Sequence, residues 1–194
     1  MRNKLLLISH WCTDALQCVS STSDFPPTQL VLVSFAKQVA MTVHYQCLSF
    51  AELSKDQLYE LLALRQEVFV VEQHCPYLDA DGQDQIALHV LGYTDNEHLA
   101  TYTRLLPKGV SYQKYAAIGR VITAAFARGK KLGRPLIQIS LQKLWEHWGP
   151  VPVKLSAQAH LQSYYRSVGF APVGDVYMED GIPHIGMVYR NEEP

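Results

Sequence analysis

The stretch IGRVITAAFARGKKLGRPLIQ, residues 118–138, holds the residue types best suited to binding a charged ligand. An apolar strand leads into a basic turn that contains glycine, and a helix follows. The first N–H groups of a helix are unpaired and lie at the positive end of its dipole, and glycine lets a phosphate approach the backbone. The pattern predicts an anion-binding turn suited to a pyrophosphate, although a solvated basic helix start has the same spacing. The turn is not a P-loop, because the Gly-Lys-Ser/Thr ending is missing.

A second stretch, HLQSYYRSVGF at residues 160–170, predicts a helix that ends at Gly169. Tyr164 and Tyr165 are adjacent, so they point about a quarter-turn apart and cannot both face the core equally. A tyrosine on a helix is most often a packing residue whose hydroxyl is satisfied.

Taken together, an R-x-x-x-x-G turn at Arg128–Gly133 and a Y-x-x-x-G-F helix end at Tyr165–Phe170 resemble the GNAT superfamily of N-acetyltransferases. The segments VFVVEQHCPY, AQAHLQSYY and EDGIPHIGM resemble its ElaA-like branch, and the resemblance covers about residues 41–190. One departure concerns the usual turn, [Q/R]-x-x-G-x-[G/A], because Lys131 stands at its first glycine position. Because the ElaA-like branch tolerates lysine at this position, the resemblance implies a working but altered phosphate cradle.

The resemblance implies a mixed α/β fold whose central sheet is split at an acetyl-CoA site, between the strands predicted at 116–122 and 153–159. Backbone groups of Val121 and Ile122 would pair with the pantetheine amides, much as an added strand would. The pyrophosphate would rest on the turn, whose members are Arg128, Gly129, Lys130, Lys131, Leu132, Gly133 and Arg134. Tyr165 matches the family's tyrosine that protonates the departing thiolate, and packing is the alternative role.

The amine acceptor that the family uses arrives protonated, with a pKa of about 10.4 for a lysine-like amine, so a base or a water chain must deprotonate it. Glu72 is the first candidate base, His89 the second and His184 the third. The acidic segment 72–84 either attracts a cationic acceptor or forms a solvated loop.

Other polar residues have structural interpretations. Arg65 lies on the apolar stripe of a helix predicted at Lys55–Val70, so we expect it to pair with an acid of the 72–84 loop. The sequence does not decide where Arg120 points. Cys75 is adjacent to His74, but neighbours in sequence do not form a catalytic pair. The eight histidines have no ligand spacing, so no metal is expected.

The predicted order of elements is β-α-β-β-β-α-β-α-β-β. A capping box, Ser54 with Gln57, opens the first helix. We interpret residues 1–40, which contain the Ser/Thr/Pro stretch SSTSDFPPTQ, as a peripheral extension or an over-called gene start. Residues 41–194 form the expected N-acetyltransferase domain.

The composition limits the partners. The chain has 194 residues and a net charge of -1, which gives no electrostatic case for nucleic acid or an anionic membrane. No apolar run approaches the ~20 residues of a membrane span, and the four cysteines are expected as reduced thiols in a cytoplasmic protein. The edge of the last strand is compatible with a homodimer.

We therefore expect acetyl transfer from acetyl-CoA to an amino group of a small molecule or a peptide, by direct attack in a ternary complex. Two alternatives remain open. A non-catalytic acyl-CoA-binding or regulatory module would bind CoA without turnover. An acyltransferase like the acyl-homoserine-lactone synthases shares the fold and a similar R-x-x-V-F helix end, here Arg65–Phe69.

Overall fold

The computed structural model describes residues 41–190, so the predicted extension at residues 1–40 lies outside the described part of the chain. A seven-stranded mixed sheet has the strand order β1-β2-β3-β4-β5-β7-β6. The strands are β1 (Val43–Ser49), β2 (Leu88–Thr94), β3 (Leu99–Leu106), β4 (Ala116–Thr123), β5 (Val153–Gln158), β6 (Ala171–Glu179) and β7 (Ile182–Tyr189). This is the predicted order of elements. The last strand, however, lies between β5 and β6, so the outer edge belongs to β6 and not to β7 as expected.

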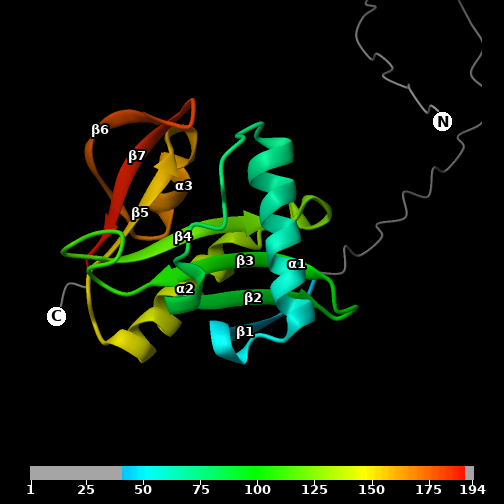
Figure 1. Ribbon diagram of the computed structural model, residues 1–194. Coiled ribbons are helices and arrows are strands. Elements are labelled where there is room, and N and C mark those ends of the chain that lie inside the picture. Colours follow the sequence, from blue (N-terminus) through cyan, green and yellow to red (C-terminus); the bar gives the residue numbers. More distant parts are fainter. Residues whose placement is uncertain (1–40, 191–194) are drawn as a thin grey trace, which may run out of the picture. The chain divides into compact units, whose positions relative to one another are not determined.

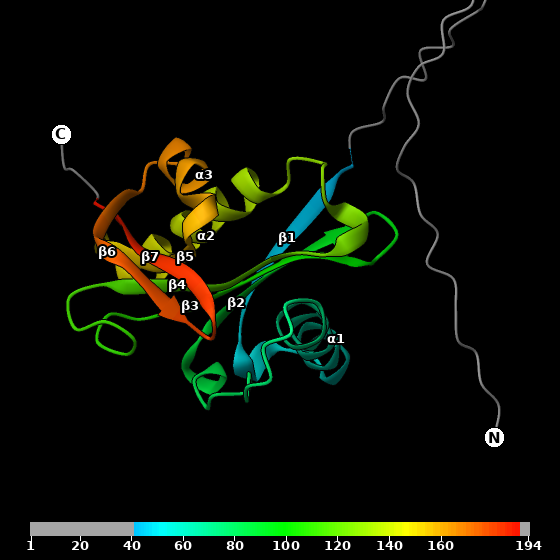
Figure 2. The same ribbon diagram turned by 90° about the horizontal axis from the view of Figure 1, so that it is seen from above.

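Helices cover both faces of the sheet. Helix α1 (Lys55–Arg65) lies on one face, whereas α2 (Gly133–Trp148) and α3 (Gln162–Ser167) lie on the other (Figure 1, Figure 2). The predicted capping box opens α1, since Ser54 Oγ accepts from Gln57 N–H and Gln57 Oε1 accepts from Ser54 N–H. The chain continues past α1 as a π-helical turn, Gln66–Glu72, so the predicted helix is present but changes its winding after Arg65.

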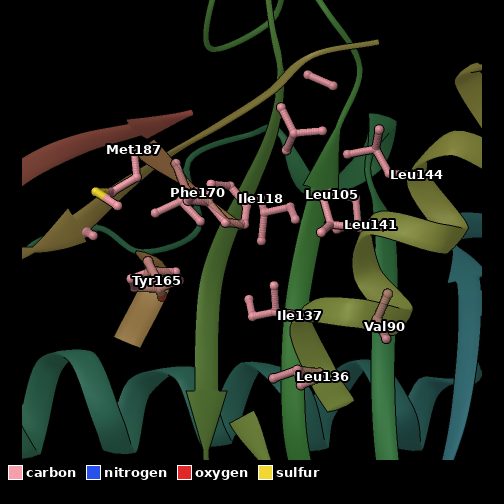
Figure 3. Packing of buried hydrophobic residues seen from close by; sticks show 14 of the residues in the cluster. Val90, Leu105, Ile118, Leu136, Ile137, Leu141, Leu144, Tyr165, Phe170 and Met187 are labelled. Carbon is pink, nitrogen blue, oxygen red and sulfur yellow. The ribbon is translucent and has the colours of Figure 1, made fainter. Parts of the chain in front are cut away.

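The main core lies between the sheet and the α2–α3 layer. Helix α2 buries Leu136, Ile137, Leu141 and Leu144, which recur at the three- and four-residue spacing of one helix face. They pack with side chains of β2–β5 and β7, and Tyr165 and Phe170 complete the cluster from the α3 side (Figure 3). A smaller cluster under α1 includes Leu61, Val68, Leu91, Tyr102 and Ile122. The two cores fix the positions of β4 and β5, between which the site lies.

Candidate active site

Strands β4 and β5 separate soon after they begin. They are parallel and pair at only two positions, Ala116 with Val153 and Ala117 with Lys154. Beyond these pairs the two strands diverge (Figure 1). The opening predicted between these two strands is therefore present. It leaves one edge of β4 available for hydrogen bonding to an extended ligand.

A β-bulge lies in β4 at this opening. On β3, Tyr102 is opposite Ile122 whereas Arg104 is opposite Gly119, so β4 has one extra residue between the two pairs. Arg120 takes up this irregularity with a φ of 52°, a left-handed value that is uncommon outside glycine. The bulge redirects the strand where its partner β5 departs.

A cavity of about 380 Å³ occupies the opening. It is lined by side chains from β3–β5, the α3 region, the β6–β7 hairpin and the loops at 73–83 and 111–112. The polar members include Gln73, Tyr77, Asp81, Arg104, Arg120, Ser156, Gln158, Tyr165, Glu179 and His184. Val121 also lines it, whereas the side chain of Ile122 is buried in the core on the α1 side.

Tyr165 reaches the cavity from α3. Its side chain is 5% exposed, and burial raises the pKa of its phenol well above the usual value. Its hydroxyl makes no hydrogen bond to any residue within 41–190, so it is available to a ligand in the cavity. The neighbouring Tyr164 points elsewhere, since its hydroxyl lies 2.8 Å from where a Cβ on Gly133 would stand. The predicted divergence of the two tyrosines is confirmed.

The turn between β4 and α2 holds the residues of the predicted phosphate cradle. Gly129 has a φ of 75° and Lys131 a φ of 61°, so both adopt the left-handed conformation. Leu132 is buried and anchors the turn, and Gly133 begins α2 against Tyr164. Lys130 and Lys131 are exposed, and Arg134 donates from Nη2 to Ser167 Oγ at 3.0 Å.

Comparisons with known proteins agree with this geometry. Residues 51–191 match the model of a family described as an acetyltransferase (GNAT) domain. The chain belongs to the GNAT acetyltransferase family. It is 49% identical to protein ElaA of Escherichia coli over 147 residues, which are 75% of this chain and 95% of that protein.

Solved structures of GNAT proteins superpose on the chain. The crystal structure of E. coli ElaA is 47% identical, has a TM-score of 0.71, and the match covers 77% of this chain and 100% of that one. An acyl-CoA N-acyltransferase from Pseudomonas aeruginosa is 45% identical, with a TM-score of 0.72 and coverage of 76% and 99%. A CoA-dependent acyl-homoserine lactone synthase, BjaI, is 16% identical with a TM-score of 0.64, and shares only the fold. Family membership implies an acyltransferase with an acyl-CoA co-substrate.

The acidic loop of this GNAT chain is held by arginines. Arg65 is fully buried and donates from Nε to Asp79 at 2.6 Å and from Nη1 to Asp84 at 2.8 Å. The predicted pairing of Arg65 with the loop is thus confirmed. Arg104 from β3 binds both oxygens of Asp81, each at 2.7 Å, and also contacts Asp84.

Arg120 joins the same network from the bulge of β4. Its Nε donates to Asp79 at 2.6 Å, and its guanidinium lies 5.8 Å from the ring centre of Phe69 and 5.6 Å from that of Tyr77. The sequence left its direction open, and the structure turns it towards the acidic loop and the cavity. The three aspartates of the loop are therefore already paired with arginines, whereas much of the segment, including Glu72, His74 and Gly82, is exposed to solvent.

Glu72 lies outside the cavity lining. It forms a two-point ion pair with Arg128, at 2.6 and 2.8 Å, and the hydrogen bonds from Arg128 hold the pKa of Glu72 below its usual value. The structure therefore brings the first candidate base to a predicted cradle residue and not to Tyr165. Both carboxylate oxygens of Glu72 accept hydrogen bonds from Arg128. The sequence had suggested that Glu72 begins a loop facing the acceptor.

His89 is also outside the cavity, fully buried in the network. Its Nε2 lies 3.0 Å from the carbonyl oxygen of Asp84, which can only accept, so Nε2 carries the proton. Nδ1 then accepts from the Tyr102 hydroxyl at 2.8 Å. Burial lowers the pKa of His89, which keeps the ring neutral. Both ring nitrogens are used within the network, so the structure places this candidate base away from the cavity that Tyr165 lines.

His184 is the candidate base that the structure places in the cavity with Tyr165. Its Nδ1 lies 2.9 Å from the carbonyl oxygen of Ile182 and must donate to it. In the neutral ring this leaves Nε2 as a proton acceptor. Cys75 also lines the cavity, but its thiol lies within 3.6 Å of two backbone carbonyls, those of Gln73 and Asp180.

Sequence reasoning missed a hydroxyl–carboxylate group in the cavity. Ser156 from β5 and Glu179 from the end of β6 both line it, and Ser156 Oγ donates to Glu179 Oε2 at 2.7 Å. Glu179 opens the segment EDGIPHIGM, which the sequence analysis used for the family resemblance but not for a site. Within residues 41–190, no group of side chains could hold a metal ion, and no helix is long and apolar enough to cross a membrane.

Proposed function

We propose that the protein transfers an acetyl group from acetyl-CoA to an amine by direct attack in a ternary complex. The observation that carries the proposal is the early separation of β4 from β5 above a cavity lined by Tyr165. The residues present fit acetyl-CoA. The free edge of β4 at Val121 and Ile122 suits the pantetheine amides. The positive φ values of Gly129 and Lys131 support a turn whose backbone N–H groups would bind the pyrophosphate.

In this proposal His184 takes the proton that the acceptor must lose. The N–H bond of the ammonium breaks, and the proton moves to Nε2, directly or through one water. The neutral nitrogen attacks the thioester carbon and the new C–N bond forms. The nitrogen then loses its second proton to solvent water, and the C–S bond breaks. A strand N–H of the β4 edge stabilises the developing oxyanion, a contribution of about 3 kcal/mol in comparable sites. Tyr165 donates its hydroxyl proton to the leaving thiolate and is reprotonated from solvent.

The exposed pair of Arg128 with Glu72 belongs to the same proposal. Arg128 stands at the first position of the cradle, and its guanidinium is held at the turn by Glu72 and by the Thr123 carbonyl, 3.1 Å from Nε. These contacts fix the direction of the turn before the ligand arrives. Glu72 therefore serves the co-substrate side of the site as a positioning residue.

Calorimetric titration of the full chain with acetyl-CoA, followed by a CoA-release assay with n-butylamine, tests the proposal. We expect saturable one-to-one binding and CoA release that depends on the amine. Binding without turnover on any amine would indicate the non-catalytic alternative. A clear preference for a longer acyl group on a carrier protein would instead indicate the synthase-like alternative, and absence of binding would contradict the proposal.

A further inference from the structure

Glu179 has an orientation imposed by two hydroxyl groups. A carboxylate only accepts hydrogen bonds, so the single hydroxyl hydrogen of Ser156 is used towards Glu179 Oε2. The Tyr177 hydroxyl lies 2.6 Å from Ser156 Oγ and must therefore donate to it. This chain of donors holds the carboxylate at the cavity and leaves Oε1 without a hydrogen bond from any residue of the described range.

The charge of Glu179 is also unmatched. The two arginines that line the cavity, Arg104 and Arg120, are paired with aspartates of the acidic loop. Glu179 makes no ion pair within residues 41–190. Lys154 packs its Nζ on the ring of Tyr112, 4.6 Å from the centre, and has no carboxylate within 4 Å in that range either. Glu179 is exposed to solvent, so a carboxylate without an ion-pair partner stands at the open side of the cavity.

A carboxylate whose orientation is fixed by hydroxyl groups is suited to an ammonium group that keeps its charge. The reacting amine has to lose its charge, and a carboxylate bound to it would raise its pKa and oppose that step. We propose that Glu179 binds a second, non-reacting cationic group of the acceptor, so that the acceptor is a small diamine or polyamine. This inference rests on the proposed acetyl transfer and names the acceptor class for that site.

The test compares three amines of equal length with acetyl-CoA: 1,4-diaminobutane, n-butylamine and 4-aminobutanoate. We expect kcat/KM for the diamine to exceed that for n-butylamine by about tenfold or more after correction for its two amines, as one charge-assisted contact implies. The carboxylate-bearing amine should be the poorest substrate. In the Glu179→Gln variant, whose amide oxygen can still accept from Ser156, the ratio of diamine to monoamine should fall towards unity.

Glu146→Gln is the matched control, because Glu146 is exposed on α2 and pairs with Lys143 outside the cavity. It should keep the full preference for the diamine. Acetylation of n-butylamine with no preference for the diamine would overturn the inference and leave the proposed function standing. A preference that survives in Glu179→Gln would overturn the role of Glu179. Failure of the folded chain to bind acetyl-CoA would overturn both.

Discussion

At the scale of single residues, burial of Tyr165 has opposite effects on the two properties that a proton donor needs. Burial raises the pKa of the phenol, so the group remains protonated through the physiological range. The same shift makes it a weaker acid. In the proposed reaction, however, the leaving thiolate forms beside Tyr165, and burial there would raise the pKa of a thiol as well. The two values rise together, which keeps the transfer feasible.

The Tyr165→Phe variant should therefore lose turnover and keep its co-substrate. The ring still fills its place between Tyr164 and Phe170, so the fold and acetyl-CoA affinity should be unchanged. We expect kcat to fall by roughly 10² to 10⁴, the usual contribution of a positioned acid. Steady-state kinetics and calorimetry on the same preparation separate the two quantities. Tyr189→Phe, outside the cavity, is the control, and equal kcat in both variants would remove Tyr165 from the mechanism.

The sequence predicted some of these residues and not others for a physical reason. Arg65 was correctly assigned to the acidic loop because an unpaired charge on an apolar stripe needs a partner nearby in the fold. Glu72 was chosen because it begins the loop expected to face the acceptor, and His89 was the second candidate. Their partners in the structure, Arg128 and Tyr102, lie far along the chain or on another strand. Which ring nitrogen of His184 is free depends on a backbone carbonyl, which no spacing rule reveals.

At the scale of elements, the turn between β4 and α2 shows how the altered cradle is built. Lys131, at the position where the family's pattern has glycine, adopts a φ of 61°. Its backbone thus reproduces the glycine conformation, at a cost of about 1 kcal/mol. Its side chain is exposed, so an added positive charge stands beside the predicted pyrophosphate site. The departure from the pattern adds a positive charge to the turn, while the backbone at this position still has a left-handed φ.

Two substitutions at Lys131 separate backbone from charge. Lys131→Gly relieves the left-handed strain, so we expect unchanged or slightly higher thermal stability and acetyl-CoA affinity within about threefold of the original, as for one exposed charge. Lys131→Val should be destabilised by about 1–2 kcal/mol, since a β-branched residue strongly disfavours positive φ. Lys130→Val is the control, because Lys130 does not have a positive φ. Thermal melts measure stability and calorimetry measures acetyl-CoA affinity. Equal thermal stability of Lys131→Val and Lys130→Val would contradict this account.

The elements themselves were largely predictable. The capping box at Ser54 and the strand predicted at 153–159 rest on local patterns, and the structure follows them. The π-helical turn after Arg65 and the bulge at Arg120 were not predicted. The π-helical turn adds a residue to the helical turn, and the bulge adds a residue to the register of β4 against β3. Neither change alters the apolar spacing that the sequence shows. The order of β6 and β7 is a long-range property, which explains the mistaken edge strand.

At the scale of the whole domain, three arginines and three aspartates join parts of the chain that are distant in sequence. Arg65 comes from α1, Arg104 from β3 and Arg120 from β4, and all three converge on Asp79, Asp81 and Asp84. The charges balance, and removing one member would leave a buried charge without its partner, a loss of about 3–5 kcal/mol in comparable networks. The network thus fixes one wall of the cavity, since Asp81, Arg104 and Arg120 line it.

The network makes stability depend on pH in the acid range. Partial burial acts to raise the pKa of Asp81, but hydrogen bonds from Arg104 and from the Gln83 N–H prevail and lower it to about 2, and the pKa of Asp84 is also lowered. The folded chain then binds fewer protons than the unfolded chain between about pH 5 and pH 2, so stability should decrease as pH falls through this range. Because Asp81 is partly exposed, we expect a loss of about 1 kcal/mol from this residue. Urea unfolding of the full chain at pH 5, 4, 3 and 2 measures the decrease.

The Asp81→Asn variant should have a lower free energy of unfolding at pH 5 and should lose less of it over the same interval, because its amide does not titrate. The Asp175→Asn variant, at an exposed position, should follow the original chain. Parallel curves for all three proteins would show that the Arg104–Asp81 pair does not carry the acid sensitivity.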